Sequence, residues 1–149
     1  MPSVAKLSLY DTDLTLWFAD TLAKLRGGNF SEVDVMHLIE EIEGLAGRER
    51  NEIESRLDVL LSHLLKRLYV DSPYDYRGWE NTIREQRKQL RRMFKPSPSL
   101  RQYAQEVFPE AWQDALADVE ANYPDTMFPH EWPYSRTVES LLSASFWTS

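Results

Sequence analysis

The segment from Val33 to Val70 constrains the fold most strongly, because its apolar residues recur at the spacing of one helix face. Residues Ile39, Ala46, Ile53 and Leu60 form a row seven residues apart. Such a row is typical of a helix that packs against other helices. The pattern spans about ten helical turns. A single long helix is therefore expected to organise the fold.

The next row on this helix is polar where ordinary packing would make it apolar. After Ile42 it reads Glu49, Arg56 and His63. Charged groups are costly to bury unless they are paired. If the following helix packs antiparallel, Gln86, Glu85 and Arg87 face these three residues. We therefore select His63, Glu49, Arg56 and Gln86 as the candidate catalytic or ligand-binding residues, and call them the polar ladder.

The polar ladder has two interpretations. A histidine beside a carboxylate can act as a general base while an arginine and a glutamine orient an anionic substrate. A buried ion-pair network that fixes the register of two helices would use the same residue types. The structural interpretation is favoured, because such networks perturb ionisable groups as active sites do. The deciding geometry is whether His63 opens on a pocket with Glu49 or Glu85 within hydrogen-bonding distance.

The remaining periodicity is also helical and predicts an all-α fold, an antiparallel bundle of about four main helices. The first expected helix runs from Asp11 or Asp13 to Gly27, and the second runs from Ser31 to Val70. The third runs from Arg77 or Gly78 to Pro96. The fourth follows the break at residues 96–99, and Pro109 is expected to restart it. The second helix either runs unbroken or bends near Gly44 and Gly47. Each glycine weakens a helix by about 1 kcal/mol relative to alanine.

The chain is expected to be a single α-helical domain over residues 1–149, since its length suits one domain with a proper core. Residues 1–10 are expected to form an N-terminal arm. Residues 123–149 are expected to be a C-terminal extension packed on the bundle. The extension begins with a loop that holds three prolines and three aromatic residues, and it ends with a short helix carrying Val138, Leu141 and Leu142.

Composition excludes several classes of function. The chain has no cysteine, which rules out disulfides, thiolate nucleophiles, cysteine-ligated zinc and iron–sulfur clusters. Residues 1–10 hold no apolar run long enough for a signal peptide, and no window approaches the apolar length of a membrane span. The expected setting is soluble and cytoplasmic.

The net charge of −7 is unevenly distributed, and residues 71–95 carry a charge of +3 between two acidic segments. Within them, Arg84, Lys88, Arg91 and Lys95 follow one helix stripe at spacings of four, three and four. Such a basic stripe suits an acidic partner protein or a phosphate backbone, although a solvated face is the commoner outcome. No nucleic-acid partner is expected, because an acidic protein gains little from counterion release.

Metal and cofactor sites find weak support in the sequence. His37 precedes Glu40 and Glu41 at helical spacings that bundle metal sites use, but the second copy that a di-metal site needs is missing. Glu40, Glu41 and Glu43 resemble one half of the magnesium motif of helical nucleotide pyrophosphohydrolases, and the other half matches poorly. A solvated acidic face is favoured, so no metal and no cofactor are expected.

Several short motifs occur together in order along the chain. They are Trp17, the run Glu40–Glu43, the run Leu60–Lys66, Trp79 with Ile83–Arg87, Ser97–Leu100, and Phe128–Pro129 with Trp132–Tyr134. In order and spacing they resemble the bacterial family catalogued as domain of unknown function number 29, from about Tyr10 to about Leu142. The resemblance implies a small α-helical fold and carries over no activity, cofactor or catalytic residue. That family often has cysteine where Glu131 or Trp132 stands here, so a cysteine-dependent role does not transfer.

Two classes of function remain from the sequence. The favoured one is a soluble protein-interaction module that presents its helices to a protein partner, because no complete catalytic constellation is visible. The alternative is a small enzyme or anionic-ligand-binding domain that uses the polar ladder. Whether the chain is an enzyme, which partner or substrate it takes, and whether it forms a homo-oligomer are left open by the sequence.

Overall fold

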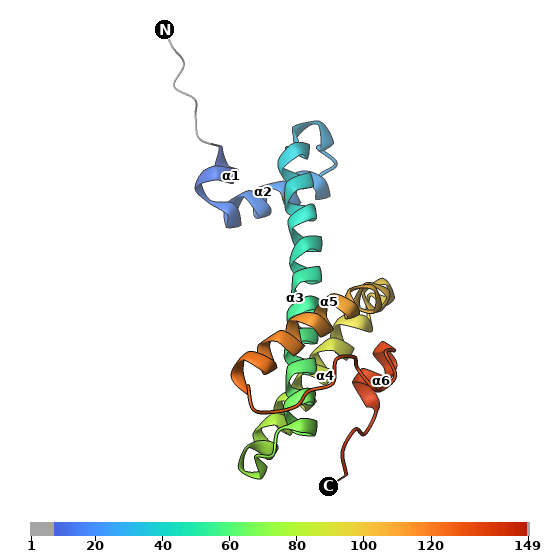
Figure 1. Ribbon diagram of the computed structural model, residues 1–149. Coiled ribbons are helices and arrows are strands. Elements are labelled where there is room, and N and C mark those ends of the chain that lie inside the picture. Colours follow the sequence, from blue (N-terminus) through green and yellow to red (C-terminus); the bar gives the residue numbers. More distant parts are fainter. Residues whose placement is uncertain (1–7, 149) are drawn as a thin grey trace. The chain divides into compact units, whose positions relative to one another are not determined.

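The computed structural model describes residues 8–148 (Figure 1), and every regular element in this part of the chain is a helix, as the periodicity predicted. Its elements are α1 (Leu9–Thr12), α2 (Leu14–Arg26), the 3-10 turn η1 (Phe30–Glu32), α3 (Val35–Tyr69), α4 (Pro73–Phe94), α5 (Pro98–Asn122) and α6 (Val138–Ser143). The four long helices confirm the expected all-α bundle. None of the described helices is both long and apolar enough to span a membrane.

The chain divides into two compact units, and the division falls within α3. The N-terminal unit ends at Gly47 and the C-terminal unit begins at Arg48. Each is described by itself. The expectation of a single domain stays a prediction, and residues 1–7 of the expected N-terminal arm lie outside the described residues.

The first predicted helix is confirmed as α2, and its ends follow from local chemistry. The Asp13 carboxylate accepts a hydrogen bond from the Leu16 amide at 3.1 Å, which satisfies one of the unpaired donors of the first turn. After the helix, Gly28 has φ of 76°, a left-handed conformation that glycine adopts without steric cost.

The predicted start of the second helix is wrong by a few residues. Ser31 lies in η1, and α3 is instead capped by Asp34, whose Oδ1 accepts from the His37 amide at 3.2 Å. A carboxylate is favoured there because the helix start carries partial positive charge. From Val35 the helix runs unbroken through Gly44 and Gly47, so the uninterrupted alternative is confirmed.

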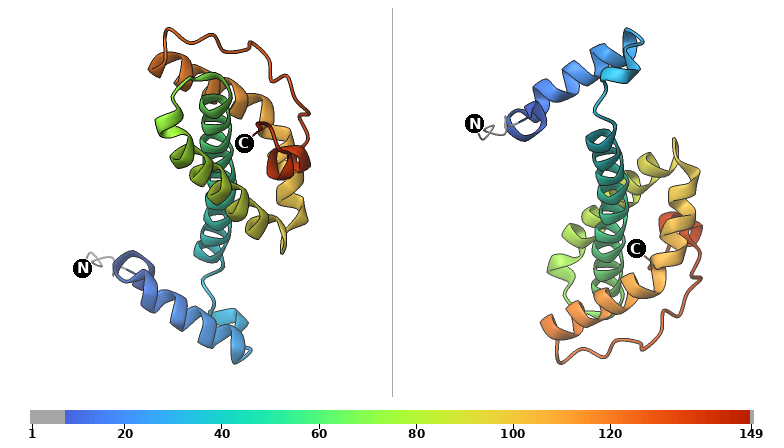
Figure 2. Two further views of the ribbon diagram at one scale, coloured as in Figure 1. Left: turned by 90° about the horizontal axis from the view of Figure 1, so that it is seen from below. Right: turned by 90° about the horizontal axis from the view of Figure 1, so that it is seen from above.

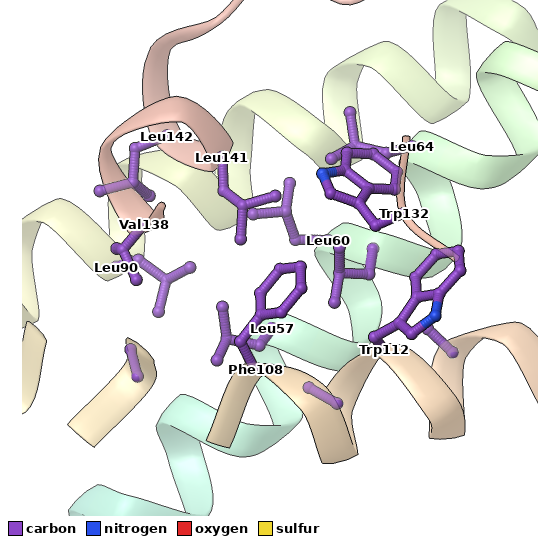
Figure 3. Close-up of a cluster of buried hydrophobic side chains, with 14 of the residues drawn as sticks. Leu57, Leu60, Leu64, Leu90, Phe108, Trp112, Trp132, Val138, Leu141 and Leu142 are labelled. Atoms are coloured by element: carbon purple, nitrogen blue, oxygen red, sulfur yellow. The ribbon is translucent and has the colours of Figure 1, made fainter. Parts of the chain in front are cut away.

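The C-terminal unit is built around the second half of α3. Six of its apolar residues are fully buried, namely Ile53, Leu57, Leu60, Leu61, Leu64 and Leu65. Figure 3 shows how α4, α5, α6 and the loop before α6 contribute to this core through Leu90, Phe108, Trp112, Trp132 and Leu141. The leucine face of α3 is therefore enclosed by elements from the whole of this unit.

Two proline positions change the predicted limits of α4 and α5. Helix α4 begins at Pro73, several residues before Arg77, because a first-turn proline lacks only an amide that would have no helical partner. The predicted restart at Pro109 is also wrong, since α5 is one continuous helix with Pro109 inside it. Figure 2 shows α5 changing direction about halfway along its length, as expected where a proline removes a helical hydrogen bond.

We predict that Leu60→Ala lowers the free energy of unfolding of the C-terminal unit by about 2–5 kcal/mol, because Leu60 has no exposed surface and its truncation leaves a cavity. The matched control is Met127→Ala, which shortens a side chain that is 89% exposed and should change stability by less than about 0.5 kcal/mol. Denaturant unfolding followed by circular dichroism measures both. Equal effects from the two substitutions would contradict the described core.

Candidate functional site

The structure brings two members of the polar ladder together. The Arg56 guanidinium on α3 donates to Oε1 of Gln86 on α4 at 3.1 Å. It also binds Glu52 one turn earlier, with Nε and Nη2 each 2.9 Å from Oε1. These residues line a hollow of about 230 Å³ together with Ser55 and Val59. Together with the ion pair of Arg67 and Glu80 at 3.5 Å, this contact confirms that α3 and α4 pack antiparallel and defines their register.

The two carboxylates considered as partners of His63, Glu49 and Glu85, do not join the Arg56–Gln86 pair. Glu49 is exposed, and among the described residues no hydrogen bond or ion pair reaches its carboxylate. Glu85 is also exposed and accepts a hydrogen bond from Gln89, one turn along α4, at 2.8 Å. The arrangement therefore places neither carboxylate on His63, and the four ladder residues do not converge on one point. Their catalytic roles remain predictions.

His63 is half-buried, and both of its ring nitrogens are engaged within α3. Nδ1 lies 2.7 Å from the Val59 carbonyl oxygen, and Nε2 lies 3.5 Å from Nζ of Lys66. A carbonyl only accepts, so Nδ1 carries the proton and Nε2 faces an ammonium group. Burial lowers the pKa of His63 below its usual value, the hydrogen bond to the Val59 carbonyl opposes this shift, and the charge of Lys66 adds to it. The net lowering of the pKa favours the neutral imidazole.

Lys66 and the next residue, Arg67, both lie close to aromatic rings. Its Nζ lies 5.6 Å from the ring centroid of Trp79, and burial lowers its pKa. One residue further, the Arg67 guanidinium lies 4.0 Å from the Tyr76 ring centroid and 5.1 Å from that of Trp147. The Arg67 guanidinium therefore contacts two aromatic rings, one on α4 and one in the segment after α6.

All four residues of the predicted basic stripe on α4 are exposed, but one of them also hydrogen-bonds another element. Arg91 donates through Nη2 to the Leu142 carbonyl oxygen, and Arg84 donates through Nη1 to the neighbouring Asn81 side chain at 2.8 Å. Lys88 and Lys95 are exposed. Part of the stripe is thus used to hold another element of the same unit, and Lys88 and Lys95 remain in solvent.

That other element is the end of α6, and the residue most engaged with it is Arg87. Its Nε donates to the Leu141 carbonyl and its Nη2 to the Ala144 carbonyl, both at 2.8 Å. The last carbonyls of a helix have no partner within the helix. Arg87 and Arg91 supply those partners and meet the negative end of the helix dipole. Helical spacing predicted that Arg87 would face the polar ladder, and spacing does not reveal an acceptor more than fifty residues away.

A cleft of about 410 Å³ lies beside these contacts. Its walls include three arginines and three apolar or aromatic side chains, namely Arg84, Arg87, Arg91, Ile83, Leu142 and Trp147. Burial and the neighbouring charge of Arg91 lower the pKa of the Arg87 guanidinium. Among the described residues none of the three arginines forms an ion pair with a carboxylate. The cleft therefore concentrates positive charge.

In the N-terminal unit, His37 is held by Asp34 and Tyr10. Its Nδ1 pairs with the Asp34 carboxylate, and its ring stacks on Tyr10 with centroids 3.9 Å apart. The hydrogen bond that His37 donates to the Asp34 carboxylate raises the pKa of His37, and Tyr10 donates to Glu41 at 2.7 Å. These groups thus satisfy one another. Nowhere in residues 8–148 do three histidine, aspartate or glutamate side chains gather as a metal ion would require.

The N-terminal unit also exposes two apolar rows. On α2 the row is Leu14, Phe18, Leu22 and Leu25; on α3 it is Val35, Ile39, Ile42 and Leu45. Each of these side chains is between 37% and 57% exposed. Their spacings of three and four residues place each row on one face of its helix. The heptad pattern revealed the second row but predicted that it would be packed.

Comparisons with known proteins identify the family and nothing beyond it. The family described as Domain of unknown function DUF29 matches residues 9–147, nearly the whole chain, so the chain belongs to that family. This confirms the resemblance seen in the motifs. No curated protein matches the chain. No solved structure matches it either.

We predict that the pKa values of His37 and His63 are shifted in opposite directions from the usual value of 6.5. The pKa of His37 should lie above 6.5 and that of His63 below it. Heteronuclear NMR titration of the imidazole resonances measures both. For His63, a lowered pKa means that stability is greatest above the unfolded-state value and declines as pH falls through the folded-state value. His63→Gln should therefore flatten the decline in unfolding free energy between about pH 7 and pH 5. A His63 pKa above 6.5 would contradict its burial.

We also predict that Arg87→Gln loosens α6. The substitution removes two charge-assisted hydrogen bonds and should cost about 1.5–3 kcal/mol of unfolding free energy. Amide hydrogen exchange around Leu141 to Ala144 should accelerate. Arg92→Gln is the matched control, since Arg92 lies on the same helix and is exposed. If α6 is equally protected from amide exchange in both variants, the inferred role of Arg87 in capping α6 is wrong.

Proposed function

We propose that this member of the DUF29 family is a protein-interaction module whose N-terminal unit binds a basic amphipathic helix of a partner protein. The observation that carries the proposal is the pair of exposed apolar rows on α2 and on the first half of α3. Exposed apolar surface of this extent is typical of interaction sites, because burying it on a partner releases ordered water.

The N-terminal unit buries little of its own apolar surface. Within residues 8–47 only Trp17 and Thr21 are buried. A segment of about forty residues rarely gains enough from its own core to stay folded without a further stabilising contact. Covering either apolar row would supply such a contact, at roughly 25 cal/mol for each Å² removed from water.

The charge around the rows selects the kind of partner. Residues 8–47 carry eight carboxylates and two cationic side chains, a formal charge of −6 with histidine neutral. On α3, helical geometry places Glu41 and Glu43 on opposite sides of the row through Ile39 and Ile42. A partner with apolar residues at helical spacing and lysine or arginine beside them complements this surface in shape and charge. A second copy of the same surface would bring like charges together.

The basic stripe is a secondary candidate for partner binding. Arg84, Lys88, Arg91 and Lys95 retain that proposed role, but Arg91 also holds the end of α6. Reversing its charge would disturb the fold of the C-terminal unit. Lys88 and Lys95 are the positions at which charge reversal tests binding without removing a described contact.

The alternative of a small enzyme or ligand-binding domain using the polar ladder has narrower support. It rests on the contact of Arg56 with Gln86 and the small hollow beside it. A general base needs a partner that orients it and access to a substrate proton. The contacts of His63 with Val59 and Lys66 supply no carboxylate for that purpose. The interaction module is therefore the better-supported function.

We predict that a synthetic helical peptide with leucine at helical spacing and lysine elsewhere binds the full chain with micromolar affinity. Replacing its lysines by glutamates should abolish binding, and added salt should weaken it because the charges are exposed. In the protein, the double change Ile39→Ser and Ile42→Ser should weaken binding at least tenfold. Isothermal titration calorimetry measures the affinity.

The control is Met127→Ser, which changes an exposed apolar residue of the C-terminal unit and should leave binding intact. Analytical ultracentrifugation of the chain alone tests whether a second copy, and not a partner protein, covers the apolar rows. A dimer that the Ile39 and Ile42 changes dissociate would show that a second copy covers the rows, which would overturn the proposal. Equal binding of the lysine and glutamate peptides would overturn it as well.

A further inference from the structure

We propose that the cleft between α4 and the segment after α6 binds a phosphomonoester carried on a flat apolar body. This site lies wholly within the C-terminal unit, does not include the two apolar rows, and shares Arg84 and Arg91 with the basic stripe. The juxtaposition that carries it is three guanidinium groups beside Trp147 around a cleft of about 410 Å³.

Among the described residues, the three arginines of the cleft form no ion pair with a carboxylate, although one carboxylate lines the cleft wall. Glu80 is the carboxylate that lines it, and Glu80 lies 3.5 Å from Arg67, outside the group of three arginines. Arg87 and Arg91 donate to carbonyl oxygens, which are neutral, and Arg84 donates to an amide oxygen. Like charges crowded in a partly enclosed site repel one another, and a bound anion relieves that repulsion.

The arginines are also held in place before any ligand arrives. Two donors of Arg87 are fixed on the end of α6, and Arg91 is fixed beside them. Each guanidinium has five N–H groups, so these contacts leave further donors on every one of the three. Immobilised arginines bind oxyanions at a lower entropic cost than mobile ones, and their planar forks suit phosphate oxygens.

The charge and the size of the cleft define the ligand. Three guanidinium groups favour a phosphomonoester, which carries a charge of about −1.5 to −2 at pH 7, over a singly charged carboxylate. The volume lies within the range of small-molecule sites, about 300–1,000 Å³, and exceeds the needs of a phosphate alone. Ile83, Leu142 and Trp147 supply an apolar wall for the remainder of the molecule.

Capping of α6 does not explain why three arginines line the cleft. Arg87 and Arg91 reach the last carbonyls of α6, whereas Arg84 does not contact α6 and is exposed in the same cleft. A cap needs no third cation at this position. Substitution of Arg84 therefore distinguishes anion binding in the cleft from capping of α6, because it reduces the charge of the cleft and leaves the described contacts of α6 intact.

The test uses the full chain and three probes that differ in one feature each: AMP, inorganic phosphate and adenosine. Isothermal titration calorimetry measures affinity, and the indole N–H resonance of Trp147 reports occupancy by NMR. AMP should bind most tightly, phosphate more weakly, and adenosine not at all at about 10 mM. Arg84→Gln should weaken AMP at least tenfold, whereas Arg92→Gln, with the same change of charge on the same helix, should leave it within twofold.

Each remaining outcome decides the proposal. Absence of binding by both AMP and phosphate at about 10 mM would overturn it, and so would equal weakening by Arg84→Gln and Arg92→Gln, which would indicate a diffuse effect of net charge. Trp147→Leu should reduce AMP to the affinity of phosphate. If that variant bound AMP as the wild type does, the apolar wall would have no part in recognition and the ligand class would be wrong.

Discussion

Burial of the leucine face of α3 is the interaction on which the C-terminal unit depends. The apolar repeat runs along both halves of this helix, but its two halves have different surroundings. From Ile53 to Leu65 the apolar residues are enclosed by α4, α5, α6 and the loop through Trp132. From Val35 to Leu45 the corresponding residues are exposed. One pattern therefore produces a core in one half and an exposed apolar surface in the other.

The fold was predictable to the extent that local chemistry decides it. The periodicity gave the helices, and a capping aspartate with a left-handed glycine gave the ends of α2. The errors arose where two residues compete for one role. Ser31 and Asp34 both suit a helix start, and the stronger acceptor caps α3. Pro109 both starts and bends helices, and only the packing of both halves of α5 decided between them.

The candidate site was less predictable, because it depends on register and on contacts between distant residues. The register in which Arg56 meets Gln86 places Trp79, and not Glu85, beside the turn that holds His63 and Lys66. Helix periodicity alone does not distinguish these registers. The anchoring of Arg87 on α6 spans more than fifty residues, so no local pattern announces it. Likewise, the exposure of Ile39 and Ile42 depends on which surfaces the rest of the chain provides.

The attachment of α6 to α4 has a consequence for the order in which the C-terminal unit assembles. The contact of Arg87 with the Ala144 carbonyl joins residues 57 positions apart, so it forms only after a large loop has closed, at an entropic cost that local helices do not incur. During synthesis at about 5–20 residues per second, α3, α4 and α5 emerge seconds before α6. In that interval the pocket for Leu141 stands open and the arginines of α4 face water. Docking of α6 is therefore the step that completes the core of the C-terminal unit.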